Sequence, residues 1–237
     1  MTENAKTLRL GSWNIRAGLG TDLRRDPLRT LDTIATMGAQ AVALQEADFR
    51  LGARPSALPV AAIRARTGLA PVTLGGEGIG WHGNALLVRR SMQWVAAGAL
   101  ELPTLEPRGA AMAELVLDGC RLRVIGMHLD LSGFRRRDQI RSILSHLEKH
   151  DDQRATVLMG DFNQWGLRSG AMGEFAKGWQ MLAPGASYPA RRPIARLDRI
   201  VVSDSCRVID GGVHHSALAA QASDHLPIWT TLKLPKK

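Results

Sequence analysis

Short apolar runs separated by polar turns dominate the chain, and they predict more strands than helices. The Asp118-Gly119 pair predicts a tight turn between two of these runs, and therefore a β-hairpin. We expect strands at residues 8–13, 41–46, 84–90, 92–100, 110–130 (the hairpin), 156–159, 196–203, 206–213 and 226–234.

Four segments are expected to form helices, and those at 26–38 and 135–150 have apolar residues spaced along one face. In the first, Asp26 can cap the helix, Pro27 suits its first turn and Gly38 suits its end. The helices are expected at residues 26–38, 57–66 (ended by Gly68), 135–150 and 168–177. Because helices intervene between groups of strands, the pattern favours sheets covered by helices, in an α/β or α+β architecture. No linker or internal repeat divides the 237 residues.

The composition indicates a large hydrophobic core and no obvious membrane-spanning segment. Hydrophobic residues make up 45% of the chain. No apolar run approaches the roughly 18 residues of a transmembrane helix, and the N-terminus lacks the pattern of a secretory signal. Cys120 and Cys206 form no C-x-x-C pair, so we expect reduced cysteines and a cytoplasmic location.

The chain is basic, with a net charge of +9 from 31 Lys and Arg against 22 Asp and Glu. Such a charge suits polyanions, which include nucleic acid, phosphorylated small molecules and anionic membrane surfaces. A generic solubilising surface explains the charge equally well, so charge alone does not identify a partner.

Several predicted strands end in a residue that could bind phosphate or a metal. In the segment TVLMGDFNQW, Asp161 and Asn163 stand two positions apart, so an extended chain points both side chains the same way. The recurrence at other strand ends suggests one cleft built from many segments. The other residues of this kind are Asn14, Glu46, His128, Asp130, Asp198, Asp224 and His225.

These motifs resemble those of the endonuclease/exonuclease/phosphatase superfamily, a group of metal-dependent phosphoesterases. The matching pieces are WNIR at 13–16, LQE at 44–46, HLDLSG at 128–133, GDFN at 160–163, RLDRIVVS at 196–203 and SDHLPI at 223–228. The resemblance spans residues 8–234. It implies an α+β fold, a four-layer α/β/β/α sandwich of two packed, mainly antiparallel sheets with helices outside, formed by residues 1–237 as one domain.

The resemblance implies a magnesium site, with manganese as a possible substitute. Glu46 is the expected metal ligand, because Mg²⁺ prefers hard oxygen ligands. Asn14 is expected beside Glu46 as part of the metal site, where it orients the ligand or touches phosphate. Asp224 is expected to contribute a further metal contact.

The same resemblance implies catalytic roles for five residues. His225 is expected to act as the general base for the attacking water, with Asp198 orienting its ring. Asp161 would align the water or protonate the leaving oxygen, and Asn163 would hydrogen-bond the scissile phosphate. His128 matches a histidine of the DNase and sphingomyelinase branches, whereas abasic-site endonucleases carry a tyrosine there.

Arginine and tryptophan side chains supply candidate substrate contacts beyond Asn14 and Asn163. Arg191 and Arg192 stand in the loop before Asp198, and guanidinium groups bind phosphate well. The triplet 135–137 is either a second phosphate contact or a solvated charge run. Trp165 directly follows the GDFN segment and could stack on a base or sugar.

We therefore expect a monomeric, Mg²⁺-dependent phosphodiester hydrolase, with nucleic acid favoured as substrate on grounds of charge. A phosphatase or phospholipase C-like enzyme acting on sugar, inositol or lipid phosphates is the alternative within the enzymes. A non-catalytic module of the same fold is the third hypothesis. Against it, none of the expected catalytic side chains is missing from the sequence.

Overall fold

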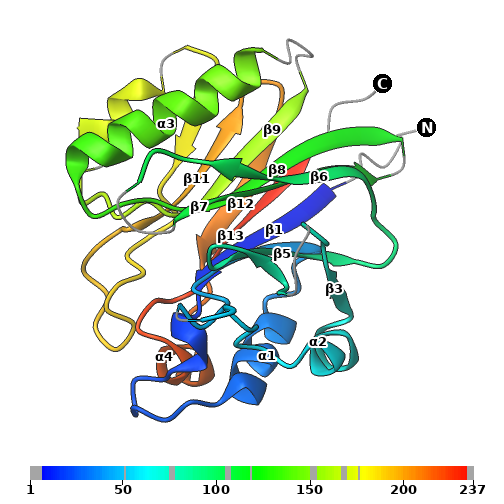
Figure 1. The fold of residues 1–237 in the computed structure, drawn as a ribbon, viewed down its shortest axis with the longest axis vertical. Coiled ribbons are helices and arrows are strands. Elements are labelled where there is room, and N and C mark those ends of the chain that lie inside the picture. The colour runs from blue at the N-terminus through cyan, green and yellow to red at the C-terminus, as the bar shows by residue number, and fades with distance from the viewer. Residues whose placement is uncertain are drawn as a thin grey trace.

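Two β-sheets packed face to face form the centre of the molecule (Figure 1). The computed structural model describes residues 7–50, 52–74, 78–104, 108–117, 119–149, 154–166, 170–175 and 177–233. The first sheet has the order β12 (Arg207–Val213), β13 (Ile228–Lys233), β1 (Thr7–Asn14), β2 (Ala41–Gln45), β5 (Asn84–Arg89) and β3 (Leu69–Pro71), with β4 (Gly80–Trp81) also paired to β5. The second has the order β10 (Trp179–Leu182), β11 (Asp198–Ser203), β9 (Ala155–Asp161), β8 (Cys120–His128), β7 (Gly109–Leu117) and β6 (Gln93–Glu101).

Helices cover the outer faces of both sheets, which gives four layers. The helices α1 (Pro27–Thr36), α2 (Val60–Thr67) and α4 (Ala217–Ala222) contribute buried side chains to a cluster with β2 of the first sheet. On the other side, α3 (Gly133–Glu148) and the 3-10 helix η2 (Gly170–Glu174) pack on the second sheet. Figure 1 shows α3 on one outer side and α1, α2 and α4 on the other. The expected α+β sandwich is confirmed.

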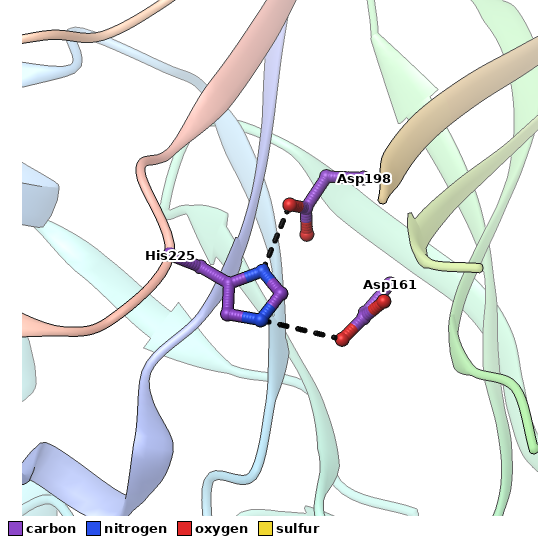
Figure 2. Close-up of side chains that lie close together, drawn as sticks. All are labelled: Asp161, Asp198 and His225. Atoms are coloured by element: carbon purple, nitrogen blue, oxygen red, sulfur yellow. Dashed lines mark hydrogen bonds and ion pairs between the residues drawn. The ribbon is translucent and has the colours of Figure 1, made fainter. Parts of the chain in front are cut away.

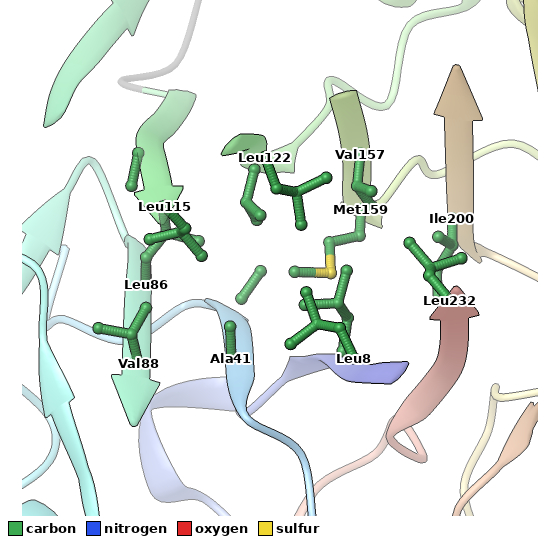
Figure 3. Packing of buried hydrophobic residues seen from close by; sticks show 14 of the residues in the cluster. Leu8, Ala41, Leu86, Val88, Leu115, Leu122, Val157, Met159, Ile200 and Leu232 are labelled. Carbon is green, nitrogen blue, oxygen red and sulfur yellow. The ribbon is translucent and has the colours of Figure 1, made fainter. Parts of the chain in front are cut away.

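The largest apolar cluster lies between the two sheets. Figure 3 shows side chains of both sheets meeting there, including Leu8 and Leu86 from the first sheet and Val157 and Met159 from the second. Leu158 belongs instead to the cluster under α3. A strand covered on both faces has no polar side, which explains why the run before Gly160 is apolar throughout.

The predicted hairpin and three of the four predicted helices are confirmed. β7 and β8 pair antiparallel with Leu117 opposite Cys120, although Asp118 of the turn lies outside the described residues. Asp26 caps α1 by accepting hydrogen bonds from the Leu28 and Arg29 amides, at 3.1 and 3.0 Å. The helix expected at 168–177 is wrong over its described part, where the structure has only the 3-10 helix η2.

Some elements were missed because they are short. The six residues of α4 and the brief strands β3, β4 and β10 carry too few apolar positions for a period to stand out. Another short element, the 3-10 helix η1 (Arg16–Gly18), follows β1. No helix in the described parts of the chain has the length and hydrophobicity that a membrane span requires.

Candidate active site

The first sheet delivers three polar residues to one edge. β1 and β2 are parallel, with Asn14 opposite Gln45, so Asn14 and the following Glu46 emerge at the same end. β13 runs antiparallel to β1, and its register places the chain just before Ile228 at that end too. His225 lies in this preceding segment, and its carbonyl accepts a hydrogen bond from the Trp13 indole at 2.8 Å.

The second sheet delivers three more residues in the same way. β8 and β9 are parallel with His128 opposite Asp161, and β11 begins antiparallel with Asp198 opposite Asp161. Close pairing here requires Gly160, because a Cβ at that position would lie 1.8 Å from the Met127 carbonyl oxygen. The glycine of GDFN is therefore a packing residue that lets β9 approach β8 just before the site.

Asp198 and His225 form a buried pair, as Figure 2 shows. The Nδ1 atom of His225 lies 2.9 Å from Oδ2 of Asp198, and the same oxygen accepts a hydrogen bond from the Ser187 hydroxyl. A carboxylate that accepts from Nδ1–H fixes the ring and leaves Nε2 free to act on a proton. The expected pairing of residues 198 and 225 is therefore present in the structure.

Asp161 lies between the two histidines. Its Oδ2 atom is 3.7 Å from His225 Nε2 and 3.5 Å from His128 Nε2, and the carboxylate is 2% exposed. Its other oxygen, Oδ1, accepts a hydrogen bond from the Asn163 amide at 2.9 Å. One buried carboxylate thus contacts both imidazoles, which gives the site a single centre.

Asn14 connects Asp161 to Glu46. The Asn14 side-chain nitrogen donates to Asp161 Oδ2 at 3.1 Å and to Glu46 Oε1 at 3.3 Å. Its amide oxygen accepts from the Arg16 backbone at 3.1 Å. The amide therefore orients two carboxylates toward a common space.

Two of these residues have left-handed backbone conformations. Glu46 has a φ of 52° and Asn163 a φ of 50°. Asparagine tolerates this region, whereas glutamate adopts it at a cost of roughly 1 kcal/mol or more. The surrounding structure holds Glu46 in place, since the adjacent Ala47 amide donates to the Gly83 carbonyl at 2.9 Å. Strain at an acidic residue is typical of a functional position.

The two histidines have opposite pKa shifts. Burial would lower the pKa of His225, but the charges of Asp198 and Asp161 outweigh burial and raise it to about 10. Burial lowers the pKa of His128 to about 3, and the charge of Asp161 offsets only part of this effect. Around neutral pH, His128 is therefore neutral, and His225 is a protonated, positively charged imidazolium as long as both carboxylates are charged.

The donor atoms at this edge suit a hard divalent cation. Ligand atoms of Asp161, Asp198 and His225 all lie within 4.8 Å of one another, and Asp198 Oδ1 has no hydrogen-bond partner among the described residues. Glu46 is a second carboxylate in reach of Asn14, with its side chain 25% exposed. Carboxylate oxygens with spare lone pairs are the ligands that Mg²⁺ takes in proteins.

The remaining predicted residues lie around this centre with partners of their own. Asp224 is 3.5 Å from the Arg16 guanidinium, and its side chain is 31% exposed. The Asn163 side chain donates to the Leu129 carbonyl at 2.9 Å. Arg191 donates to the Thr21 carbonyl at 2.8 Å. The side chains of Arg192 and Trp165 are exposed.

Sequence reasoning missed three residues that support the pair of Asp198 and His225. Ser187 donates to Asp198, and the ring of Tyr188 lies 4.8 Å from that of His225 between centroids. Ser223 donates to the Asn14 carbonyl at 2.7 Å, which ties the His225 segment to the end of β1. Ser223 stands inside the SDHLPI motif and Ser187 stands outside every motif, and a hydroxyl with no periodic pattern gives no sequence sign of its partner.

Comparison with known proteins identifies the family. The sequence profile of the Endonuclease/Exonuclease/phosphatase family matches residues 11–225. The chain belongs to this family. Its members are phosphoesterase hydrolases, so the resemblance inferred from short motifs is confirmed.

A curated relative from this comparison is the uncharacterized protein YbhP of Escherichia coli strain K12. It is 25% identical over 134 residues, which cover 53% of this chain and 53% of YbhP. The chain therefore spans about half the length of the curated relatives it matches.

Solved structures of the family share the fold over nearly the whole chain. The family protein of Beutenbergia cavernae DSM 12333 has a TM-score of 0.76 and 21% identity, over 97% of this chain and 72% of that one. D. rerio TDP2 humanized by 14 mutations has a TM-score of 0.74 and 19% identity, over 95% of this chain and 98% of that one. The mannosyl-6-phosphatase Bt3783 of Bacteroides thetaiotaomicron has a TM-score of 0.75 and 17% identity, over 95% of this chain and 99% of that one. At these identities the likeness establishes the fold.

Proposed function

We propose that this chain hydrolyses phosphodiesters with a water molecule activated by His225 and Asp198 and a divalent cation, Mg²⁺ or in its place Mn²⁺. One observation carries the proposal: Asp161 contacts His225, His128 and Asn14 through a single buried oxygen. A binding module with no chemistry has no need for such a buried and coupled group. The non-catalytic hypothesis is therefore disfavoured.

Glu46 and Asp161 are the proposed holders of the cation, with Asn14 orienting both. Asp224 is a further proposed contact, and it would have to leave Arg16 to reach the cation. When bound, the cation would offset the negative charge of the phosphate and of Asp161.

His225 is the proposed general base, and it must be neutral to accept a proton. Its pKa is raised by the charges of both Asp198 and Asp161, so neutralisation of Asp161 would move the pKa back toward the neutral range. Asp198 would accept a hydrogen bond from Nδ1–H throughout, which leaves Nε2 to take the proton of the water.

Hydrolysis then follows from the positions of the remaining groups. The water oxygen adds to phosphorus, one P–O ester bond breaks, and the leaving oxygen receives a proton, which gives a phosphomonoester and an alcohol. Asp161 would align the water or return a proton to the leaving oxygen. Neutral His128 and the side-chain amide of Asn163 would hydrogen-bond the phosphate oxygens.

Nucleic acid is the substrate favoured by the net charge of +9. Arg191 and Arg192 would contact phosphates and Trp165 would stack on a base or sugar. A phosphatase or phospholipase C-like activity is the alternative, and related folds include both a mannosyl-6-phosphatase and a TDP2 complexed with a single-strand DNA product.

The test is hydrolysis of bis-nitrophenyl phosphate by purified protein with Mg²⁺. We expect His225→Ala to reduce turnover by at least ~10²-fold, as removal of a general base does. His215→Ala removes an exposed imidazole outside the site and serves as the matched control. EDTA should abolish activity and Mg²⁺ or Mn²⁺ should restore it.

Near-normal turnover of His225→Ala would remove this residue from the mechanism, and EDTA-resistant hydrolysis would argue for different chemistry. A parallel screen of nucleic acids, phospholipids and phosphomonoesters would identify the preferred ester. Absence of hydrolysis of every ester by the wild-type protein with Mg²⁺ or Mn²⁺ would support the non-catalytic hypothesis.

A further inference from the structure

The most exposed large hydrophobic side chains form a group that the proposed chemistry does not use in full. Five of them are between 66% and 81% exposed, whereas the other strongly exposed ones among the described residues reach only 39–54%. We call the five the apolar rim: Leu23, Leu131, Phe134, Trp165 and Ile194. The less exposed group is Leu28, Val60, Trp94, Val95 and Ile209.

Two segments that leave the second sheet carry three members of the rim. Leu131 follows His128 by three residues, and Phe134 lies in the first turn of α3. Trp165 follows Asn163 by two. The segments are held together by Arg136, whose guanidinium donates to the Leu131 carbonyl at 2.6 Å and to Gln164 Oε1 at 3.0 Å.

The other two members stand on loops beside the first sheet's part of the site. Ile194 belongs to the loop of Tyr188, with its amide donating to the Tyr188 carbonyl at 2.9 Å. Leu23 lies in the turn after η1, and this turn is joined to the same loop by the bond from Arg191 to the Thr21 carbonyl. Four rim residues therefore lie on loops and Phe134 lies in the first turn of α3, all in segments that carry or contact site residues.

Leu23 is strongly exposed and has an unfavourable backbone conformation. Its φ is 61°, in the left-handed region that a bulky side chain rarely adopts, and its side chain is 76% exposed. Exposure of a leucine and a left-handed backbone both cost free energy in water. The cost of exposing the leucine is removed if an apolar environment covers this side chain when the protein binds its partner.

Cationic residues flank the apolar rim. Arg24 and Arg25 follow Leu23, and Arg191 and Arg192 precede Ile194. Two nearby acidic groups already have arginine partners: Asp22 in the Leu23 turn pairs with Arg29 at 2.7 Å, and Asp224 in the segment before β13 pairs with Arg16. Apolar tips surrounded by arginine are complementary to an anionic surface with an apolar layer beneath it.

The aliphatic members distinguish between two anionic partners. Nucleic-acid bases stack on aromatic rings, which would use Trp165 and Phe134 but gives Leu23, Leu131 and Ile194 no partner. The acyl and glycerol region of a bilayer accepts all five side chains, while the arginines remain among the phosphates. The composition of the rim therefore favours a membrane surface.

We propose that the apolar rim docks on the surface of an anionic phospholipid bilayer, so that the site faces the phosphodiester of a lipid headgroup. The substrate part rests on the proposed phosphodiesterase function, whereas the docking part stands without it. A rim of this size lies on the membrane and does not span it.

The docking test is co-sedimentation of the full chain, in EDTA to prevent turnover, with vesicles of phosphatidylcholine, with or without phosphatidylglycerol. We expect binding to the mixed vesicles, weakened by added salt, and far weaker binding to phosphatidylcholine alone. The double variant Leu131→Ser/Phe134→Ser should bind the mixed vesicles at least about tenfold more weakly. The matched control Val95→Ser/Ile209→Ser removes two exposed apolar side chains elsewhere and should bind as the wild type does.

Two further measurements separate the possible failures. Equal thermal unfolding midpoints would confirm that both double variants are folded, and Leu131→Ser/Phe134→Ser should hydrolyse soluble bis-nitrophenyl phosphate at the wild-type rate. Vesicle binding without hydrolysis of any ester would leave the docking intact and contradict the proposed function. Soluble hydrolysis by a wild type that ignores the mixed vesicles would overturn the docking and leave the proposed function standing. If Leu131→Ser/Phe134→Ser binds a single-stranded oligonucleotide more weakly than the wild type and the wild type does not bind vesicles, the membrane proposal is overturned in favour of nucleic acid.

Discussion

The site has two halves that share Asp161 and differ in how complete they are. The imidazole half, made of Asp198, His225 and Ser187, is buried and already connected by hydrogen bonds. The carboxylate half, made of Asn14 and Glu46, includes a residue with a strained backbone, Glu46, whose side chain remains partly exposed. Under the proposed function, proton handling would rest on contacts already built into the fold, whereas the other half would receive the cation and the anionic substrate.

The largest effect is expected at the residue that both halves share. Asp161→Asn should lower turnover of bis-nitrophenyl phosphate by about 10³-fold or more, because it removes a proposed cation ligand and a contact of His225 together. Asp204→Asn, which changes an exposed acid elsewhere, is the control. An Asp161→Asn enzyme within tenfold of the wild type would mean that the two halves do not depend on this carboxylate.

A smaller and more selective effect is expected in the carboxylate half. Glu46→Gln keeps the shape of the side chain but removes its charge, so we expect about 10²-fold lower activity and a higher Mg²⁺ concentration at half-maximal rate. Because the imidazole half is intact, the pH profile at saturating Mg²⁺ should keep its form. An unchanged Mg²⁺ requirement would remove Glu46 from the metal site.

The smallest effect is expected on stability, from the imidazole half. In EDTA the folded pKa of His225 is raised from 6.5 to about 10, so its stabilising contribution is full below pH 6.5 and is lost as the pH rises toward 10. Urea unfolding should show that the free energy of unfolding of the wild type declines as the pH rises across this range. The decline should be smaller in His225→Gln and unchanged in His215→Gln. Equal declines in all three proteins would contradict the raised pKa.

The sequence predicted the elements of the fold better than their arrangement. Apolar periodicity located the strands that carry the site, but nothing local shows that β1 pairs with both β2 and β13. That order depends on side chains distant in sequence that bury one another between the sheets. The four-layer arrangement came from the resemblance of short motifs, and the structure confirms it.

The motifs named residues that the structure brings together, but they did not show the distant partners on which the proposed roles depend. The residues from GDFN and SDHLPI meet at one edge, yet the bond between Asp224 and Arg16 and the support from Ser187 follow from loop conformations that no pattern records. The roles of the individual residues, the single domain, the cytoplasmic location and the monomeric state stay predictions.

A crystal structure with Mn²⁺, located by its anomalous scattering, tests the central claim most directly. We predict a manganese peak at about 2.0–2.2 Å from carboxylate oxygens of both Glu46 and Asp161, absent from crystals of the Glu46→Gln variant. A peak held by other residues, or none at this edge of the sheets, would contradict the account.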